Sequence, residues 1–329
     1  MLVKPRLLVV QLWGIGDLVI TTPFLRAASK KFSVTLVAKP LAEELRPHLW
    51  PDIEVVPFVA PWTAFEGKYR LWRWPWLEML RLRRRLIGQN FDYGVAGRWD
   101  PRDHWLLKAS GAKERLGFSH LNSRSYLTRE LTRPSPLAHM SEYWREAGRA
   151  LGLEVQGRSE MILPPRISAS GALLHSGARL SARVWPLENF KQIAANLRKK
   201  NIPVQIACDP DQCAWWKNQG ENPVCPRTIS ELFSVVERAG IFVGNCSGPG
   251  HVAAISGVPT FTLFGPSMHE WWIPMHPAAE FFEGKACPYK PCSDYCRYAK
   301  PFCITDVSAE AVWPRIELFA QKHLTARSA

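Results

Sequence analysis

The stretch LLVVQLWGIGD, residues 7–17, decides the fold. Its first part, Leu7–Leu12, is an almost continuous apolar run, which is typical of a strand buried on both faces of a parallel sheet. Gly14 and Gly16 then allow a tight turn and a close approach of the backbone to a ligand. An amphipathic stretch at Thr22–Lys31 predicts the helix that follows, so the segment begins a βαβ unit. Val19 occupies the place of the third glycine of the dinucleotide fingerprint, which makes a nicotinamide-dependent oxidoreductase a weak alternative.

The same alternation recurs along the whole chain. Further strands are predicted at residues 34–37, 53–56, 93–96, 172–175, 204–207, 241–243 and 260–264, and further helices at 77–87, 141–151, 187–200, 229–238 and 251–256. Pro and Gly interrupt both periodicities within 157–170, which predicts a linker between lobes at residues 1–160 and 161–329. We therefore predict an α/β fold with two Rossmann-like lobes, whose parallel sheets direct their loops into a central cleft.

The composition predicts a soluble globular protein. The chain has 329 residues, of which 47% are apolar and 22% charged, enough for two ordinary cores. No apolar run approaches the roughly 20 residues that a membrane-spanning helix needs. The first apolar stretch, Leu7–Trp13, is too short and wrongly flanked for a signal peptide. We therefore expect a cytoplasmic location.

Basic residues outnumber acidic ones, and most of the excess lies in the first lobe. Forty-two Lys and Arg against 29 Asp and Glu give a formal charge of +13. Residues 1–165 hold 25 basic and 16 acidic residues, a net +9, and residues 166–329 hold 17 and 13, a net +4. The first lobe is therefore expected to attract an anionic partner. Charge alone leaves open whether that partner is a phosphorylated substrate, a membrane surface or a nucleic acid.

Tryptophans and basic residues are interleaved within residues 62–85. They are Trp62, Trp72, Trp74 and Trp76, with Lys68, Arg70, Arg73, Arg81, Arg83, Arg84 and Arg85. One interpretation is a solvated basic helix whose aromatic side chains pack on the lobe. The other is a membrane-interface segment, because Trp favours the headgroup layer and each basic residue adds about 1 kcal/mol near anionic lipid. A nucleic-acid patch is the least favoured interpretation, since no recognised nucleic-acid module accompanies the segment.

Asp17 is the first candidate catalytic residue. It follows the glycine loop at the start of a helix, on the side of the sheet that faces the predicted cleft. Asp is common as a helix cap at such a place, and a carboxylate there can equally act as a general base. The motif alone leaves both interpretations open.

Two arginines follow the first strand of the second lobe. HSGAR at residues 175–179 comes directly after the strand, and RVWP at residues 183–186 leads into the next helix, whose first turn suits Pro186. Guanidinium groups at Arg179 and Arg183 would be able to bind phosphate in a fork geometry. Either arginine alone is equally consistent with plain surface charge.

The stretch VGNCSGPGH, residues 243–251, is a second strand-to-helix junction in this lobe. Its glycines and Ser247 expose backbone N–H groups at the positive end of a helix, which is a ready anion site. The Lys-Ser/Thr of a nucleoside-triphosphate loop is missing, so a pyrophosphate that carries a leaving group fits better than a transferable γ-phosphate. The next strand ends in TLFGPS, residues 262–267, which places Gly265 in another loop on the same side.

All eight cysteines lie after residue 207. Buried thiols are the expected state of the scattered Cys208, Cys213, Cys225 and Cys246. Cys287, Cys292, Cys296 and Cys303 form a cluster without the C-x-x-C pair of a regular zinc site. We favour a small loop held by packing or by an opportunistic disulfide over a metal site there.

These elements together resemble glycosyltransferase family 9, the bacterial ADP-heptose:lipopolysaccharide heptosyltransferases and their relatives. The matching stretches are QLWGIGD at 11–17 with Thr22-Pro23, HSG at 175–177 with RVWP at 183–186, GN at 244–245 with SGP at 247–249 and His251, FGP at 264–266, and the tail with Cys292, Cys296 and Cys303. They follow the family's order over nearly the whole chain. The resemblance implies the GT-B architecture, with the C-terminal helix near residues 307–321 packing back towards the first lobe.

By this resemblance the chain is an inverting glycosyltransferase with Asp17 as its catalytic base. Asp17 would take the proton of an acceptor hydroxyl as that oxygen attacks the anomeric carbon of an ADP-sugar, with heptose as the sugar. Arg183 stands where the family has a phosphate-binding Lys. The implied donor-binding residues are Arg183, Arg179, Ser247, Gly248, His251 and Gly265. These groups supply the electrostatics, so neither a metal nor another cofactor is implied. An Asp17 buried in an ion pair would contradict the assignment.

The resemblance also implies an anionic, lipid-linked saccharide of the lipopolysaccharide-core type as acceptor, at the cytoplasmic face of the inner membrane. It therefore favours the membrane-interface interpretation of residues 62–85, with peripheral membrane contact and no nucleic acid as partner. The predicted acceptor-binding residues are Gly16, Thr22, Arg70, Arg73 and Arg81. The two lobes hold base and donor separately, so turnover should require domain closure.

The chain departs from the family at three positions. Cys246 stands where members have an Asp that is thought to contact the donor sugar, and Ser267 and Met268 replace a Thr and an Asp. These changes leave the phosphate cradle intact but leave the sugar open. The alternative from another class is a non-catalytic basic protein that binds an anionic glycolipid.

Overall fold

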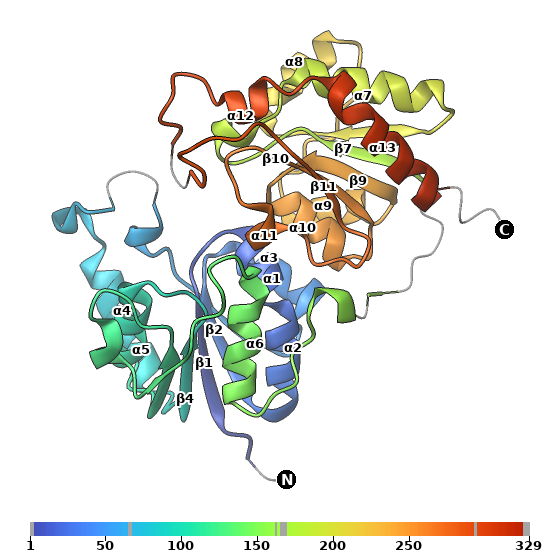
Figure 1. Ribbon diagram of the computed structural model, residues 1–329. Helices are drawn as coiled ribbons and strands as arrows, with labels where there is room; N and C mark the ends of the chain where they lie inside the picture. The colour runs from blue at the N-terminus through green and yellow to red at the C-terminus, as the bar shows by residue number, and fades with distance from the viewer. Residues whose placement is uncertain (1–2, 65–67, 162, 165–169, 293–294, 325–329) are drawn as a thin grey trace. The chain divides into compact units, whose positions relative to one another are not determined.

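A computed structural model describes residues 3–64, 68–161, 163–164, 170–292 and 295–324 (Figure 1). The chain divides into two compact units, Met1–Gly157 and Arg158–Ala329. The predicted linker at 157–170 is described only in part, since residues 162 and 165–169 lie outside the described residues.

The first unit is built on a parallel sheet of six strands. They are β1 (Arg6–Gln11), β2 (Ser33–Ala38), β3 (Glu54–Pro57), β4 (Tyr93–Ala96), β5 (Glu114–Gly117) and β6 (Arg129–Glu130). Their order in the sheet is β3-β2-β1-β4-β5-β6, which is the order of a dinucleotide-binding fold. Strand β1 is central, with Val9 opposite Leu36 of β2 on one side and Val95 of β4 on the other.

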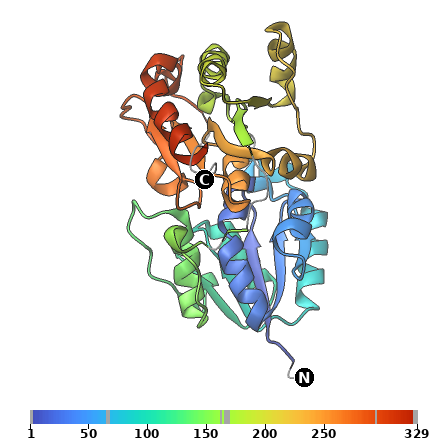
Figure 2. The same ribbon diagram turned by 90° about the vertical axis from the view of Figure 1, so that its right-hand side faces the viewer.

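Helices cover both faces of this sheet. They are α1 (Ile15–Ile20), α2 (Thr22–Lys31), α3 (Leu41–Leu49), α4 (Trp76–Ile87), α5 (Pro101–Ala109) and α6 (Met140–Ala150). Helices α2 and α6 lie side by side on one face in both views (Figure 1, Figure 2), where Phe24 packs on Trp144 with ring centroids 5.0 Å apart. The opposite face carries α4 and α5, and its core joins Leu8 and Val10 to Leu82 of α4.

The second unit has a parallel sheet of five strands. They are β7 (Ser170–His175), β8 (Val204–Ala207), β9 (Ala239–Asn245), β10 (Thr260–Phe264) and β11 (Glu280–Glu283), in the order β11-β10-β9-β7-β8. The helices are α7 (Leu187–Lys199), α8 (Cys213–Asn218), α9 (Ile229–Val236), α10 (Gly248–Ile255), α11 (His269–Trp272), α12 (Phe302–Thr305) and α13 (Ala309–Leu324).

The C-terminal helix α13 is built into the core of this second unit. Phe319 packs on Phe261 of β10, and Ile316 belongs to the same buried cluster as Leu197 of α7. Lys200, directly after α7, pairs with Glu317 at 2.6 Å. Within the second unit, α13 thus packs its apolar face on its own sheet, and its expected packing towards the first lobe stays a prediction.

The predicted α/β class with two parallel sheets is confirmed, and the predicted strands and helices occur with ends shifted by a few residues. Strands β5, β6 and β11 and helices α3, α5, α8, α11 and α12 were not predicted. Strand β6 has only two residues, and Pro47 lies inside α3. The periodic pattern of apolar residues is therefore too short or too interrupted to predict these two elements. Among the described residues, none of the helices has both the length and the apolar character needed to cross a bilayer.

Candidate functional site

Each sheet has a point at which the strand order reverses, and ligands of such folds bind at the carboxyl ends of the strands there. In the first unit this point lies between β1 and β4, and in the second between β7 and β9. The loops that follow these four strands carry Asp17, Arg98, the HSG stretch at 175–177 and the NCSGPGH stretch at 245–251. We call the loops after β1 and β4 the first edge, and the loops after β7 and β9 the second edge.

At the first edge, Asp17 lies in the first turn of α1. Its Oδ2 accepts a hydrogen bond from the backbone N–H of Gly14 at 3.2 Å, so the capping interpretation is correct in part. Its Oδ1 lies 3.8 Å from a guanidinium nitrogen of Arg98, and the Asp17 side chain keeps 15% of its surface exposed. This separation exceeds the roughly 2.8 Å of a charge-assisted hydrogen bond. Asp17 is thus in a loose, partly exposed ion pair rather than a buried one.

Arg98 is a site residue that the sequence analysis missed. It comes two residues after β4, and its guanidinium lies over the rings of Trp13 and Trp99, 5.0 and 5.2 Å from their centroids. The two indoles hold a cation in a fixed place beside Asp17. Arg98 follows β4, the strand beside β1. This position indicates a site residue only once the strand order is known.

Asp103 of α5 is a second missed residue. It is completely buried, and its carboxylate accepts hydrogen bonds from the indole N–H groups of Trp62 at 2.9 Å and Trp13 at 3.4 Å. Burial raises the pKa of Asp103 to about 7, against the opposing effect of the two indole donors. The buried Asp103 carboxyl therefore holds Trp13 in place, and the Arg98 guanidinium lies over the Trp13 ring.

Thr22 does not occupy the place expected for an acceptor-binding residue. It is completely buried, and its hydroxyl accepts a hydrogen bond from the indole N–H of Trp50 at 3.0 Å. The neighbouring Thr21 instead donates its hydroxyl to the backbone carbonyl of Asp17 at 2.7 Å. Gly16 lies beside Asp17 in the first turn of α1. The phase of α2 thus turns the Thr22 side chain inward, and an acceptor contact by Thr22 stays a prediction.

At the second edge, Asn245 connects the loops. It is completely buried at the end of β9, and its Oδ1 accepts a hydrogen bond from the backbone N–H of Trp185 at 3.0 Å. Its amide nitrogen donates to the carbonyl of Ser176 at 2.8 Å. Asn245 therefore fixes the RVWP and HSG stretches relative to the start of α10.

Two buried polar atoms at this edge point to a ligand. Among the described residues, Nε of Arg183 and Oγ of Ser247 have no hydrogen-bond partner although both are buried. Ser247 precedes the first residue of α10, Gly248, so the positive end of that helix lies beside its hydroxyl. A cation, a hydroxyl and backbone N–H groups are what a diphosphate requires.

The other predicted donor-binding residues differ in their exposure to solvent. His251 is buried on α10, whereas Arg179 is exposed. A side chain at Gly265 would meet Cβ of Ile304 at 2.5 Å, so this glycine allows α12 to pack on the loop. Burial lowers the pKa of His175 to about 4, which keeps its imidazole neutral where its Nδ1 accepts from the N–H of Gly177 at 3.2 Å.

Cys246 lies in an apolar setting. Its cluster contains Phe264 and Ile273, with Trp272 and Phe281 packed against it. Burial raises the pKa of the Cys246 thiol, although Arg183 nearby opposes the shift. The side chain is therefore a neutral thiol next to the candidate phosphate-binding arginine.

The segment 62–85 combines a buried half and an exposed half. Residues 65–67 lie outside the described residues. Trp62 is buried, and Trp74 packs on it at 5.6 Å between ring centroids. Trp72 and Leu77 are 78% and 73% exposed. The predicted acceptor residues Arg70, Arg73 and Arg81 are all exposed on the same segment.

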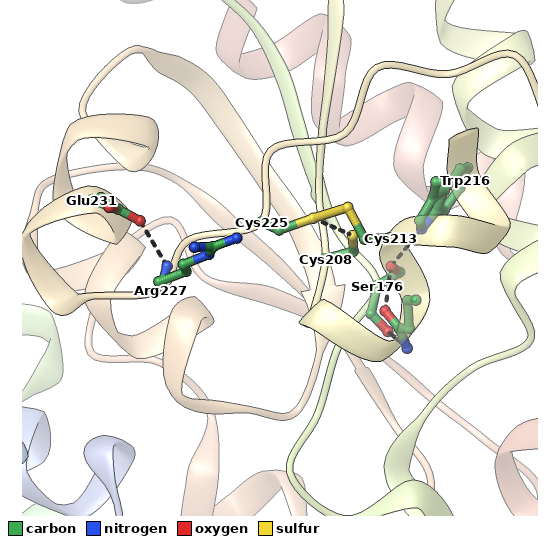
Figure 3. The surroundings of a disulfide bond; sticks show 8 residues. Ser176, Cys208, Cys213, Trp216, Cys225, Arg227 and Glu231 are labelled. Atoms are coloured by element: carbon green, nitrogen blue, oxygen red, sulfur yellow. Dashed lines mark hydrogen bonds between the residues drawn. A yellow bond between two sulfur atoms is a disulfide. The ribbon is translucent and has the colours of Figure 1, made fainter.

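The cysteines differ in part from expectation. Cys208 and Cys246 are buried thiols as predicted, but Cys213 and Cys225 form a disulfide (Figure 3). The four tail cysteines are free thiols, so the opportunistic disulfide expected there is not present. The pairing was missed because it depends on how the segment after β8 folds back.

The chain is similar to known heptosyltransferases in part of its sequence and in its fold. Residues 156–301 match the model of glycosyltransferase family 9 (heptosyltransferase). Lipopolysaccharide heptosyltransferase 3 of Escherichia coli K12 is 27% identical over 109 residues, covering 30% of this chain and 31% of the relative. A second Escherichia coli protein of that name is 24% identical over 154 residues, covering 44% and 42%. The alignments thus span less than half the length of these curated relatives.

Solved structures share the fold. The E. coli heptosyltransferase WaaC with ADP has a TM-score of 0.72 at 17% identity, covering 96% of this chain and 100% of that one. A family 9 glycosyl transferase from Veillonella parvula has a TM-score of 0.71 at 19% identity, covering 98% and 99%. Residues 156–301 are thus similar to glycosyltransferase family 9 (heptosyltransferase), and the chain shares the fold of these solved structures.

Proposed function

We propose that this protein is an inverting glycosyltransferase that moves a heptose from an ADP-heptose to an anionic saccharide of the lipopolysaccharide-core type. The observation that carries the proposal is the pair of buried, unpartnered atoms at the second edge, Nε of Arg183 and Oγ of Ser247, beside the start of α10. The similarity to lipopolysaccharide heptosyltransferase 3 and to a heptosyltransferase with ADP supports the donor and acceptor classes.

Asp17 is the proposed general base. As the acceptor oxygen forms its bond to the anomeric carbon, its proton passes to Asp17, and the bond from that carbon to the diphosphate oxygen breaks on the opposite face. One such displacement inverts the anomeric centre through an oxocarbenium-like state. Arg98 supports this role, because its guanidinium lies 3.8 Å from Oδ1 and helps to orient the carboxylate.

The leaving diphosphate gains negative charge as the bond breaks. We propose that Arg183, Ser247 and the N–H groups at Gly248 receive this charge, with His251 and Arg179 as further donor contacts. Charge stabilisation of this kind needs no metal, and no step of the proposal uses one. The proposed base and the proposed donor cradle belong to different units.

The donor sugar has an unusual neighbour in Cys246. A thiol packed among Phe264 and Ile273 does not offer the two strong acceptor oxygens of a carboxylate. Any heptose hydroxyl at this point therefore needs another partner, and a sugar that lacks that hydroxyl would be tolerated. A panel of ADP-sugars tests this point directly, since a ligand at 100 times its dissociation constant adds about 2.7 kcal/mol to the free energy of unfolding.

The acceptor side is proposed to lie on the exposed part of segment 62–85. Arg70, Arg73 and Arg81 would hold carboxylates or phosphates of the acceptor, and Trp72 with Leu77 would enter the lipid interface. We therefore propose a peripheral position on the cytoplasmic face of the inner membrane. Replacing the three arginines with Ala should raise the acceptor KM while ADP-heptose binding stays unchanged.

The Asp17→Asn variant tests the proposed reaction. We expect transfer to fall about 10²- to 10⁴-fold, the usual contribution of a general base, with ADP binding retained. Asp52→Asn, a change at an exposed carboxyl of the same unit, is the control and should keep full activity. A non-catalytic binding protein would show no transfer in wild type and equal glycolipid binding in both variants, which would reject the proposal.

A further inference from the structure

The segment after β8 brings three cysteines together. Cys208 directly follows β8, and its backbone N–H donates to the carbonyl of Val224 at 3.1 Å. Cys225 therefore lies on a neighbouring extended stretch, while Cys213 is the first residue of α8. Backbone hydrogen bonds and a helix start thus hold the three residues in place.

The three sulfur atoms form one compact group. All lie within 4.8 Å of one another, and Sγ of Cys208 is 3.4 Å from Sγ of Cys225 (Figure 3). Cys213 and Cys225 are joined as a disulfide, and Cys208 faces that bond as a buried thiol. Thiolates bound to one zinc ion at about 2.3 Å lie at most about 4.6 Å apart, so only a small adjustment separates this group from a metal-binding set.

We propose that Cys208, Cys213 and Cys225 form a binding site for one thiophilic divalent cation, with Zn²⁺ as the probe, once a dithiol or phosphine reductant has opened the disulfide. Reduction converts the disulfide to two thiols with two electrons and two protons. The cation then displaces three protons from the three thiols, and its fourth tetrahedral position takes water. No other redox change is involved.

The charge around Cys208 favours this occupant over a bare thiolate. The negative charges of Asp209 and Asp211 act on the Cys208 sulfur. A divalent cation reverses the local balance, because both carboxylates then act on a positive centre.

The proposed cation site would stabilise the HSG loop of the second edge. Gln212, next to Cys213, accepts a hydrogen bond from the Ser176 hydroxyl at 2.8 Å, and the Trp216 indole N–H donates to that hydroxyl at 2.9 Å. A side chain at Gly177 would collide with the carboxylate of Asp209. Closing the three cysteines on a cation therefore fixes the residues that support the HSG loop, a structural role independent of the proposed transfer.

The test uses the full chain, reduced with a phosphine, given Zn²⁺ and counted by native mass spectrometry. We expect Cys208→Ala to hold one zinc fewer than wild type. Cys246→Ala, which removes a different buried thiol, should hold the wild-type number. Counting by difference separates this group from the tail cysteines, which remain in every sample.

A crystal of the reduced wild-type protein with Zn²⁺ gives a second readout that no variant's folding can affect. An anomalous peak at the zinc edge between the three sulfurs supports the proposal. Three results overturn it: equal zinc in wild type and Cys208→Ala, no peak at this place, or a Cys213–Cys225 bond that stays closed in millimolar reductant.

Discussion

The guanidinium of Arg98 lies 3.8 Å from the carboxylate of Asp17, and the two residues come from loops after neighbouring strands, β4 and β1. The pair thus spans the point where the order of the first sheet reverses. Asp17 is held from two sides, by the N–H of Gly14 and by this cation. A carboxylate so placed is oriented before any substrate arrives, which is the arrangement that a general base requires.

Replacing Arg98 with Lys should lower kcat about 10-fold and leave the KM for ADP-heptose unchanged. The flat guanidinium lies over both Trp13 and Trp99, and an ammonium group cannot contact two ring faces in the same way. Steady-state kinetics with saturating acceptor measures the effect. Arg102→Lys is the matched control, because Arg102 pairs with Asp100 instead. Full kcat in Arg98→Lys would show that the pair does not position Asp17.

Asp103 should make stability depend on pH. Its pKa rises from 3.8 to about 7 on folding, so folding takes up a proton between these values. The free energy of unfolding therefore falls as the pH rises through this window, by about 1.4 kcal/mol per unit, and levels off above about pH 7.

The Asp103→Asn variant isolates this effect. Its amide imitates the protonated acid and can still accept from the Trp62 indole. We expect the melting temperature of the variant relative to wild type to rise between pH 5 and pH 7 and then stay constant. Asp52→Asn, at an exposed carboxyl, should show no such trend. A difference independent of pH would mean that Asp103 is ionised throughout.

Asn245→Asp should destabilise the second unit by about 2–3 kcal/mol. The change keeps the shape and the acceptor for the Trp185 N–H but removes the donor to the Ser176 carbonyl, leaving two oxygens facing each other in a fully buried place. Thermal unfolding measures the loss, and ADP binding should weaken with it because the loops separate. Asn218→Asp, at the exposed end of α8, should leave both unchanged. An unaltered melting temperature would contradict the linking role of Asn245.

The sequence predicts the local elements well because buried parallel strands are apolar on both faces. Leu7–Val10 within β1 and Ile241–Val243 within β9 show this directly. The Asp17–Arg98 pair escapes such reasoning, since it depends on β4 lying beside β1. The burial of Thr22 escapes it as well, since a motif does not give helix phase; the Thr22 hydroxyl accepts a hydrogen bond from Trp50.

The cysteine pairing was likewise not predicted from the sequence. The spacing of the tail cysteines suggested a disulfide there, whereas the disulfide joins Cys213 and Cys225. That pairing depends on the backbone bridge between Ala207 and Val224, a contact that no local pattern indicates. Residues that touch through strand order or chain reversal are therefore the part of a site that sequence reasoning finds last.

The exposed half of segment 62–85 should bind anionic vesicles. Trp72 and Leu77 are largely exposed, and the exposed arginines beside them would attract acidic headgroups. We expect cosedimentation with vesicles that contain phosphatidylglycerol, weakened by salt because the attraction is screened. The double variant Trp72→Ser, Leu77→Ser should bind about 10-fold more weakly, since each apolar side chain that leaves lipid contributes on the order of 1 kcal/mol.

Two comparisons make this vesicle test decisive. Leu318→Ser removes an exposed leucine from α13 in the other unit, so it should bind as wild type does. Zwitterionic vesicles should retain little of either protein, because only the apolar contribution remains. Equal binding of wild type and the double variant to anionic vesicles would show that the segment is a solvated basic helix, and the exposed tryptophan would then need another partner.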